Sequence, residues 1–174
     1  GVSTSDVSWA HEGENPADHC GLMHLSEATV LHNTVQRAAD GKFYTWVGPG
    51  QLISVNPCKR IAELFGEKKM GEFRGRMVGT TADTLEPHAY AVAEAAMSEL
   101  HRRPRVAVLV SGESGAGKTE VNRLVVAYIV WRDGEVAAAG GRKSQYAAAG
   151  HARSVAEGVL RSSVMLEALG NASM

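Results

Sequence analysis

An eight-residue segment, GESGAGKT, carries the residue types that bind phosphate groups. It fits the pattern G-x-x-x-x-G-K-[ST] of the phosphate-binding loop. The glycines let the backbone coil so that successive N–H groups point inward at an anion. Lys118 supplies a positive charge for the β- and γ-phosphates, and Thr119 supplies a hydroxyl for Mg²⁺, which prefers oxygen ligands. The predicted phosphate and metal site comprises Gly112, Glu113, Ser114, Gly115, Ala116, Gly117, Lys118 and Thr119.

Two apolar runs flank this loop and predict the elements that position it. Residues 106–110 (VAVLV) form a continuous apolar run, as expected of a strand buried on both faces of a parallel sheet. After the loop, Val121, Leu124, Val125 and Tyr128 recur at helical spacing. A helix beginning there would aim its positive N-terminal end at the bound phosphate. This context favours a phosphate site over a glycine turn that binds nothing.

The rest of the chain predicts mainly helices and one hairpin. Two β-rich runs surround Gly48-Pro49-Gly50 and predict antiparallel strands. Pro87 suits the first position of a helix. The Ala- and Gly-rich residues 134–150 predict a flexible loop, and residues 1–20 a polar tail or surface segment. Further helices are expected at residues 22–40, 59–77 (interrupted by glycines), 87–100 and 151–169.

Composition and charge exclude several classes of protein. The 174 residues are 44% apolar and 21% charged, which is typical of a globular domain. A net charge of −1 predicts no nucleic-acid partner, and no apolar run is long enough for membrane insertion. Cys20 and Cys58 share no motif, which favours a reducing, intracellular compartment.

No residue qualifies from the sequence as a catalytic group. A phosphate-loop hydrolase needs an acidic residue near Mg²⁺ and a group that positions the attacking water. Asp133 belongs to the helix after the loop, and no buried strand precedes Asp18. Glu113 lies within the loop itself. Four possible zinc ligands fit no tight zinc pattern: His11, His19, Cys20 and His24.

Four segments together resemble the myosin motor domain, in order and with similar spacing. They are GKFYTWVGPGQLISVNPCKRI, EPHAYAVAEAAMSEL, GESGAGKTE and LEALGNA. The resemblance implies an α/β fold of the P-loop NTPase type, incomplete here, in which helices flank a mostly parallel sheet. It also implies an actin-based ATPase motor, of which residues 21–174 would be a partial motor domain.

The resemblance further implies a set of ligands, partners and site residues. Asn56, Pro57 and Lys59 would border the adenine of ATP or ADP, and Gly112 to Thr119 would hold the phosphates and Mg²⁺. Residues 134–150 would form a loop near the nucleotide entrance. Actin filaments would bind through regions absent from this chain, which would pack against the remainder of the motor domain. The implied location is cytoplasmic and cytoskeleton-associated.

Departures from the family pattern limit what we expect of the chain itself. Cys58 stands where the family commonly has an aromatic residue, and Leu64 or Phe65 replaces the tyrosine expected near adenine. Ser163-Val164 replaces an Asn-Pro pair, and the chain ends before the N-x-x-S-S-R segment. We therefore expect negligible ATP turnover. Two alternatives remain: a truncated, non-catalytic interaction or dominant-negative module, and a small P-loop kinase or NTPase of another family.

Overall fold

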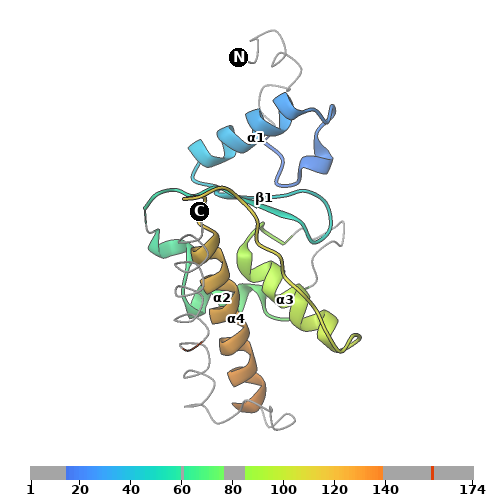
Figure 1. Cartoon of the computed structure of the whole chain (residues 1–174), viewed down its shortest axis with the longest axis vertical. Coiled ribbons are helices and arrows are strands. Elements are labelled where there is room, and N and C mark those ends of the chain that lie inside the picture. The colour runs from blue at the N-terminus through green and yellow to red at the C-terminus, as the bar shows by residue number, and fades with distance from the viewer. Residues whose placement is uncertain (1–14, 60, 77–84, 139–157, 159–174) are drawn as a thin grey trace, which may run out of the picture.

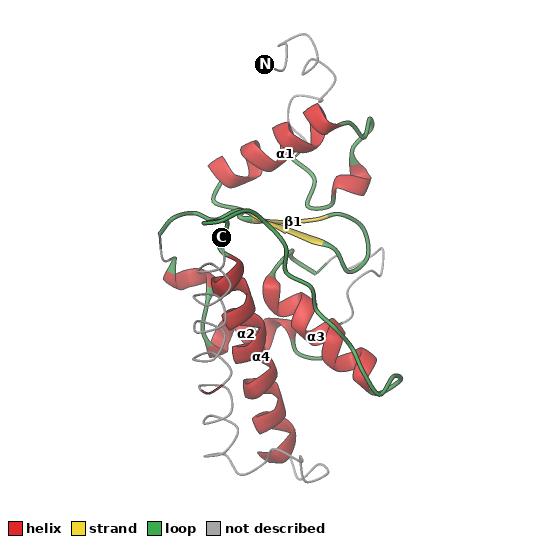
Figure 2. Cartoon of the chain, in the orientation of Figure 1, coloured by secondary structure: helices red, strands yellow, loops and turns green. Residues whose placement is uncertain are grey.

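The computed structural model describes residues 15–59, 61–76, 85–138 and 158, and its helices lie on both sides of a small β-hairpin (Figure 1). Helix α1 lies on one side of the hairpin, and helices α2, α3 and α4 lie on the other (Figure 2). The elements in chain order are η2 (His19–Gly21), α1 (Glu27–Ala39), β1 (Tyr44–Trp46), β2 (Leu52–Ser54), η3 (Ala62–Leu64), α2 (Glu67–Phe73), α3 (Ala89–Leu100) and α4 (Lys118–Ala138), where η marks a 3-10 helix.

Helix α1 is fixed at its start by a cap and near its end by a buried arginine. The side chains and backbone N–H groups of Ser26 and Thr29 bond reciprocally in a capping box. Arg37 is 4% exposed, and its guanidinium donates to Thr45 Oγ1 at 2.9 Å and to the Tyr44 carbonyl at 3.0 Å. These contacts attach α1 to β1. The helix predicted within residues 22–40 is confirmed, although it begins only at Glu27.

The predicted hairpin is confirmed. Strands β1 and β2 pair antiparallel, with Tyr44 opposite Ser54 and Trp46 opposite Leu52. All three residues of β1 are buried. The Trp46 indole N–H donates to the Leu85 carbonyl at 3.0 Å, so this ring connects the hairpin to the chain that leads into α3. The hairpin therefore joins the two groups of helices.

The core of the described region lies beneath the hairpin, between α2, α3 and α4. His88 is 1% exposed, and the rings of Tyr44, Phe73 and Tyr90 lie within about 5 Å of its own, at 4.7, 5.2 and 4.5 Å between centroids. Tyr90 in turn stacks on Tyr128 of α4 at 5.3 Å. These aromatic contacts position α4, the helix that follows the phosphate-binding loop.

The mostly parallel sheet predicted from the sequence is not formed by the described residues. Their only sheet is the antiparallel pair β1–β2. Residues 106–110 have no strand assignment, Leu109 is 93% exposed, and Val106 and Val108 are 36% and 37% exposed. A buried parallel strand needs a hydrogen-bonding neighbour, and no described strand supplies one. The prediction of a buried strand at 106–110 is therefore wrong for this structure.

Several predicted boundaries also differ. Helix α3 begins at Ala89 because the His88 side chain accepts the Tyr90 N–H as an N-cap, so Pro87 lies before the helix. The segment 59–77 divides into η3 and α2. Helix α4 continues to Ala138, so the first five residues of 134–150 are helical rather than loop. The rest of that segment lies outside the described residues, as does the helix predicted at 151–169 apart from Gly158.

The described end of the N-terminal polar segment packs against the hairpin. Asp18 forms an isolated parallel bridge with Trp46, and its carboxylate accepts the N–H groups of Cys20 at 2.9 Å and Gly48 at 3.0 Å. His19 is fully buried. Within the described part of the chain, no helix is both long and apolar enough to span a bilayer.

Candidate nucleotide-binding site

The glycines of the phosphate-binding loop have backbone conformations that other residues rarely adopt. Gly117 has a φ of +93°, and a Cβ there would lie 3.6 Å from the side chain of Asn56. A Cβ on Gly112 would lie 3.1 Å from the Ala116 Cβ, a close contact between two backbone-attached atoms. The Ala116 N–H donates to the Glu113 carbonyl at 3.2 Å and closes a tight turn. The loop is therefore a compact coil that depends on glycine, as its sequence predicts.

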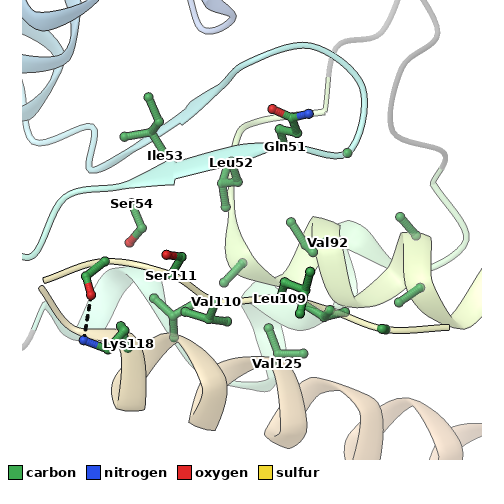
Figure 3. Close-up of a pocket in the computed structure, with 18 of the residues that line it drawn as sticks. Gln51, Leu52, Ile53, Ser54, Val92, Leu109, Val110, Ser111, Lys118 and Val125 are labelled. Atoms are coloured by element: carbon green, nitrogen blue, oxygen red, sulfur yellow. Dashed lines mark hydrogen bonds between the residues drawn. The ribbon is translucent and has the colours of Figure 1, made fainter.

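Lys118 is the first residue of α4 and its side chain folds back over the loop. Its ammonium group donates to the carbonyl of Glu113 at 2.8 Å. It also donates to the carbonyl of Gly112 at 2.9 Å, the bond drawn as a dashed line in Figure 3. A lysine ammonium has three N–H donors, and these two bonds use two of them. The contacts hold the positive charge at the mouth of the loop, where the N-terminal end of α4 adds its own partial positive charge.

A pocket of about 380 Å³ brings together the two sets of residues predicted for nucleotide binding. Asn56, Pro57 and Lys59 line one part of it, and Ala116 and Gly117 of the loop line another. The remaining lining includes residues that the sequence reasoning assigned no role in binding: Phe43, Tyr44, Ser54, Val55, Glu120, Val121, Arg123 and Leu124.

The pocket residues that come from α4 could have been identified from their spacing in the sequence. Glu120, Arg123 and Leu124 are three or four residues apart and share a face of the helix. Arg123 forms an ion pair with Glu120 beside the pocket. Leu64 and Phe65, the residues that replace the expected tyrosine, both line the pocket, so an apolar wall is available to a planar ring.

A larger, mainly apolar cavity of about 850 Å³ lies between β2, α3, α4 and residues 106–110. Figure 3 shows Val110 and Leu109 crossing this space on an extended backbone, with Leu52 from the hairpin and Val125 from α4 facing it. Lys118 lines the cavity too. The phosphate-binding loop thus continues into a well-packed helix, α4, at its C-terminal end and follows the exposed residues 106–109 at its N-terminal end.

The structure places the acidic candidate Asp133 too far from the loop to hold a metal ion there. Asp133 lies fifteen residues along α4 from Lys118, which at 1.5 Å rise per residue is about 22 Å away. Among the described residues, no group of three or more His, Cys, Asp or Glu side chains is arranged to hold a metal ion. His11 lies outside the described residues. Thr119 is exposed in the first turn of α4, beside the loop.

Comparisons with known proteins identify the family of the chain. The myosin head (motor domain) family matches residues 16–174. Among curated relatives, Myosin-6 of Arabidopsis thaliana is 38% identical over 89% of this chain, Protein OPAQUE1 of Zea mays 38% over 92%, and unconventional myosin-VI of Bos taurus 32% over 89%. The chain spans only 9–10% of the length of these three relatives. A family match over nearly all of the sequence shows that the chain belongs to the myosin family, as a segment of its motor domain.

Proposed function

We propose that this chain binds Mg·ATP and Mg·ADP through residues Gly112–Thr119, as the nucleotide-docking part of an actin-based motor. The observation that carries the proposal is that loop residues line the same pocket as Asn56, Pro57 and Lys59. Phosphates would lie over the coiled loop and its lysine, and the base would enter the adjoining pocket. Membership in the myosin family also removes the alternative of a small kinase from another family.

Each loop element has a separate task in this proposal. Lys118 neutralises the β- and γ-phosphates with the ammonium group held over the loop. Thr119 offers its hydroxyl to Mg²⁺, the hard cation that would link it to the phosphates. Phe65 and Leu64 offer apolar contact to the base in place of the missing tyrosine. Glu113 contributes its backbone carbonyl to Lys118 and has no assigned catalytic role.

The activity of a complete motor is part of the same proposal. Actin binding and ATP hydrolysis would involve regions of the motor domain outside this chain, and the location would be the cytoskeleton of the cytoplasm. We assign no catalytic residue among the described ones. We therefore expect the chain by itself to turn over ATP at the background rate.

Titration calorimetry with Mg·ATP tests the proposal. The wild-type chain should bind, and Lys118→Ala should weaken binding by about 10- to 100-fold, because hydrogen bonds to charged groups contribute roughly 1.5–3 kcal/mol. Lys42→Ala is the matched control, since Lys42 is an exposed lysine in the turn after α1. It should bind as the wild type does.

Equal binding by the Lys118→Ala and wild-type chains would contradict the proposal. If partner binding alone persisted, and was indifferent to Lys118→Ala, the non-catalytic interaction module would be the better description. ATP turnover above background that disappears in Lys118→Ala would instead show that the chain is a competent enzyme.

A further inference from the structure

Asn56 connects the end of the hairpin to the phosphate-binding loop. Its side-chain Nδ2 donates to the Gly115 carbonyl at 2.8 Å, across 59 residues of sequence. Its Oδ1 accepts the Cys58 N–H at 2.9 Å, which fixes the turn that follows β2. Both ends of the amide are therefore bonded to protein. A side chain that reads a nucleotide base would instead direct these atoms at the base.

The bond from Asn56 determines the orientation of one peptide plane in the loop. Because a trans peptide is planar, holding the Gly115 carbonyl toward Asn56 also fixes the direction of the Ala116 N–H. That N–H donates to the Glu113 carbonyl at 3.2 Å. The same carbonyl accepts the Lys118 ammonium at 2.8 Å. Asn56 is thus linked through a single peptide unit to the atom that holds Lys118.

Packing supports the same connection. The position of a Cβ on Gly117 would be 3.6 Å from Asn56 Cβ and Cγ and 3.7 Å from its Nδ2. The amide therefore lies against the loop on two sides, at the Gly115 carbonyl and at the Gly117 backbone. The segment before the loop supplies no comparable support, because residues 106–109 are exposed and have no strand partner among the described residues.

We propose that Asn56 is a positioning residue that holds the phosphate-binding loop and, through the Glu113 carbonyl, the Lys118 ammonium. This inference rests on the proposed nucleotide binding and deepens it, since it changes the role predicted for Asn56 from bordering the base to organising the phosphate site. The contribution of Asn56 to binding affinity should therefore be the same for every ligand that carries the phosphates, whichever base is attached.

Asn56→Ser is the variant that separates these roles. A serine hydroxyl can still accept the Cys58 N–H, but it is too short to replace the amide that reaches Gly115. The change adds no charge, so it does not repel phosphates as an aspartate would. Asn56 is exposed, and the free energy of unfolding in urea should stay close to that of the wild type. Lys42→Ala is again the control, because Lys42 is exposed and lines neither of the two cavities.

Calorimetric titrations with Mg·ATP, Mg·GTP and Mg·pyrophosphate provide the test. Asn56→Ser should weaken all three by the same factor, about 3- to 10-fold for the loss of one neutral hydrogen bond, and the preference for ATP over GTP should be unchanged. Lys42→Ala should leave the binding of all three ligands unchanged. In a Lys118→Ala background, Asn56→Ser should have little further effect on pyrophosphate binding, because its contribution passes through Lys118.

Two results would overturn the inference while leaving nucleotide binding intact. Unchanged pyrophosphate binding with a reduced ATP preference would make Asn56 a base-reading residue. If the losses of binding free energy in Asn56→Ser and Lys118→Ala were additive in the double variant, Asn56 would not act through Lys118. Failure of the wild-type chain to bind any of the three ligands would instead refute the proposed function itself.

Discussion

The contact between α3 and α4 and the segment before the phosphate-binding loop differ sharply in how many of their polar groups form hydrogen bonds. Where α3 packs on α4, Glu94 is 2% exposed, and its carboxylate accepts the Tyr128 hydroxyl at 2.8 Å, Arg132 Nε at 3.1 Å and the Gly75 N–H at 2.9 Å. Ahead of the phosphate-binding loop, residues 106–109 are extended and exposed, and no described strand pairs with them.

This difference indicates that stability and ligand binding depend on separate parts of the chain. The α3–α4 contact buries charged and aromatic groups that bond to one another, so a change there should affect folding. The loop is held by a few short hydrogen bonds from Lys118 and Asn56, so a change there should affect binding. The exposed segment before the loop should contribute little to the stability of the described region.

Removing the buried carboxylate should have the largest effect on stability. Glu94→Ala leaves the Tyr128 hydroxyl, Arg132 and the Gly75 N–H without their acceptor. Breaking a buried ionic network from one side typically costs about 3–5 kcal/mol. We expect a loss of that size in urea unfolding followed by circular dichroism. Glu99→Ala, which breaks an exposed pair with Arg103, is the control and should cost less than about 1 kcal/mol. Similar losses for both variants would contradict the comparison.

His88 should make the same core sensitive to acid. Burial lowers the pKa of His88 to about 4, from an ordinary value near 6.5. Its Nδ1 accepts the Tyr90 N–H, so its other nitrogen, 3.0 Å from the Leu64 carbonyl, donates in the neutral ring. Since the unfolded chain binds the proton more readily, stability is full above pH 6.5 and falls as the pH drops toward 4. The expected loss is about 3 kcal/mol.

Comparison with His88→Asn isolates this contribution from the other titrating groups. Asparagine is a good N-cap and does not titrate, so it can keep a bond to the Tyr90 N–H. Lys69, Glu72 and Glu86 also act on the His88 charge and stay in place in both proteins. The wild type should lose more stability than the variant between pH 6.5 and 4 in urea titrations. Parallel pH profiles would show that His88 is not a buried neutral group.

The features predicted correctly from the sequence are those fixed by neighbouring residues. The hairpin follows from its Gly-Pro-Gly turn, and α1 and α4 follow from local apolar spacing. The compact loop follows from its glycines. The start of α3 was misplaced because the His88 side chain caps the helix, and a histidine is not among the usual capping residues.

The features predicted wrongly or missed depend on contacts between distant residues. The apolar run 106–110 fits a buried strand, but only a hydrogen-bonding neighbour makes it one, and the described residues contain none. The bond from Asn56 to Gly115 joins residues 59 positions apart, which no spacing rule indicates. Glu120, Arg123 and Leu124, by contrast, lie on one face of α4 and could have been found from periodicity.

The smallest effect is expected at Leu109, the most exposed large apolar side chain among the described residues. Leu109 is 93% exposed, so Leu109→Ser should change the free energy of unfolding by no more than about 0.5 kcal/mol. Leu124→Ser is the matched control, because Leu124 is 6% exposed within the core and should cost about 2–5 kcal/mol. Urea unfolding measures both. A loss at Leu109 as large as that at Leu124 would mean that residues 106–110 are buried in solution. Because burial requires partners for the backbone N–H and C=O groups as well as for the side chain, such a result would show that the backbone of this segment has hydrogen-bonding partners in solution, as a paired strand does.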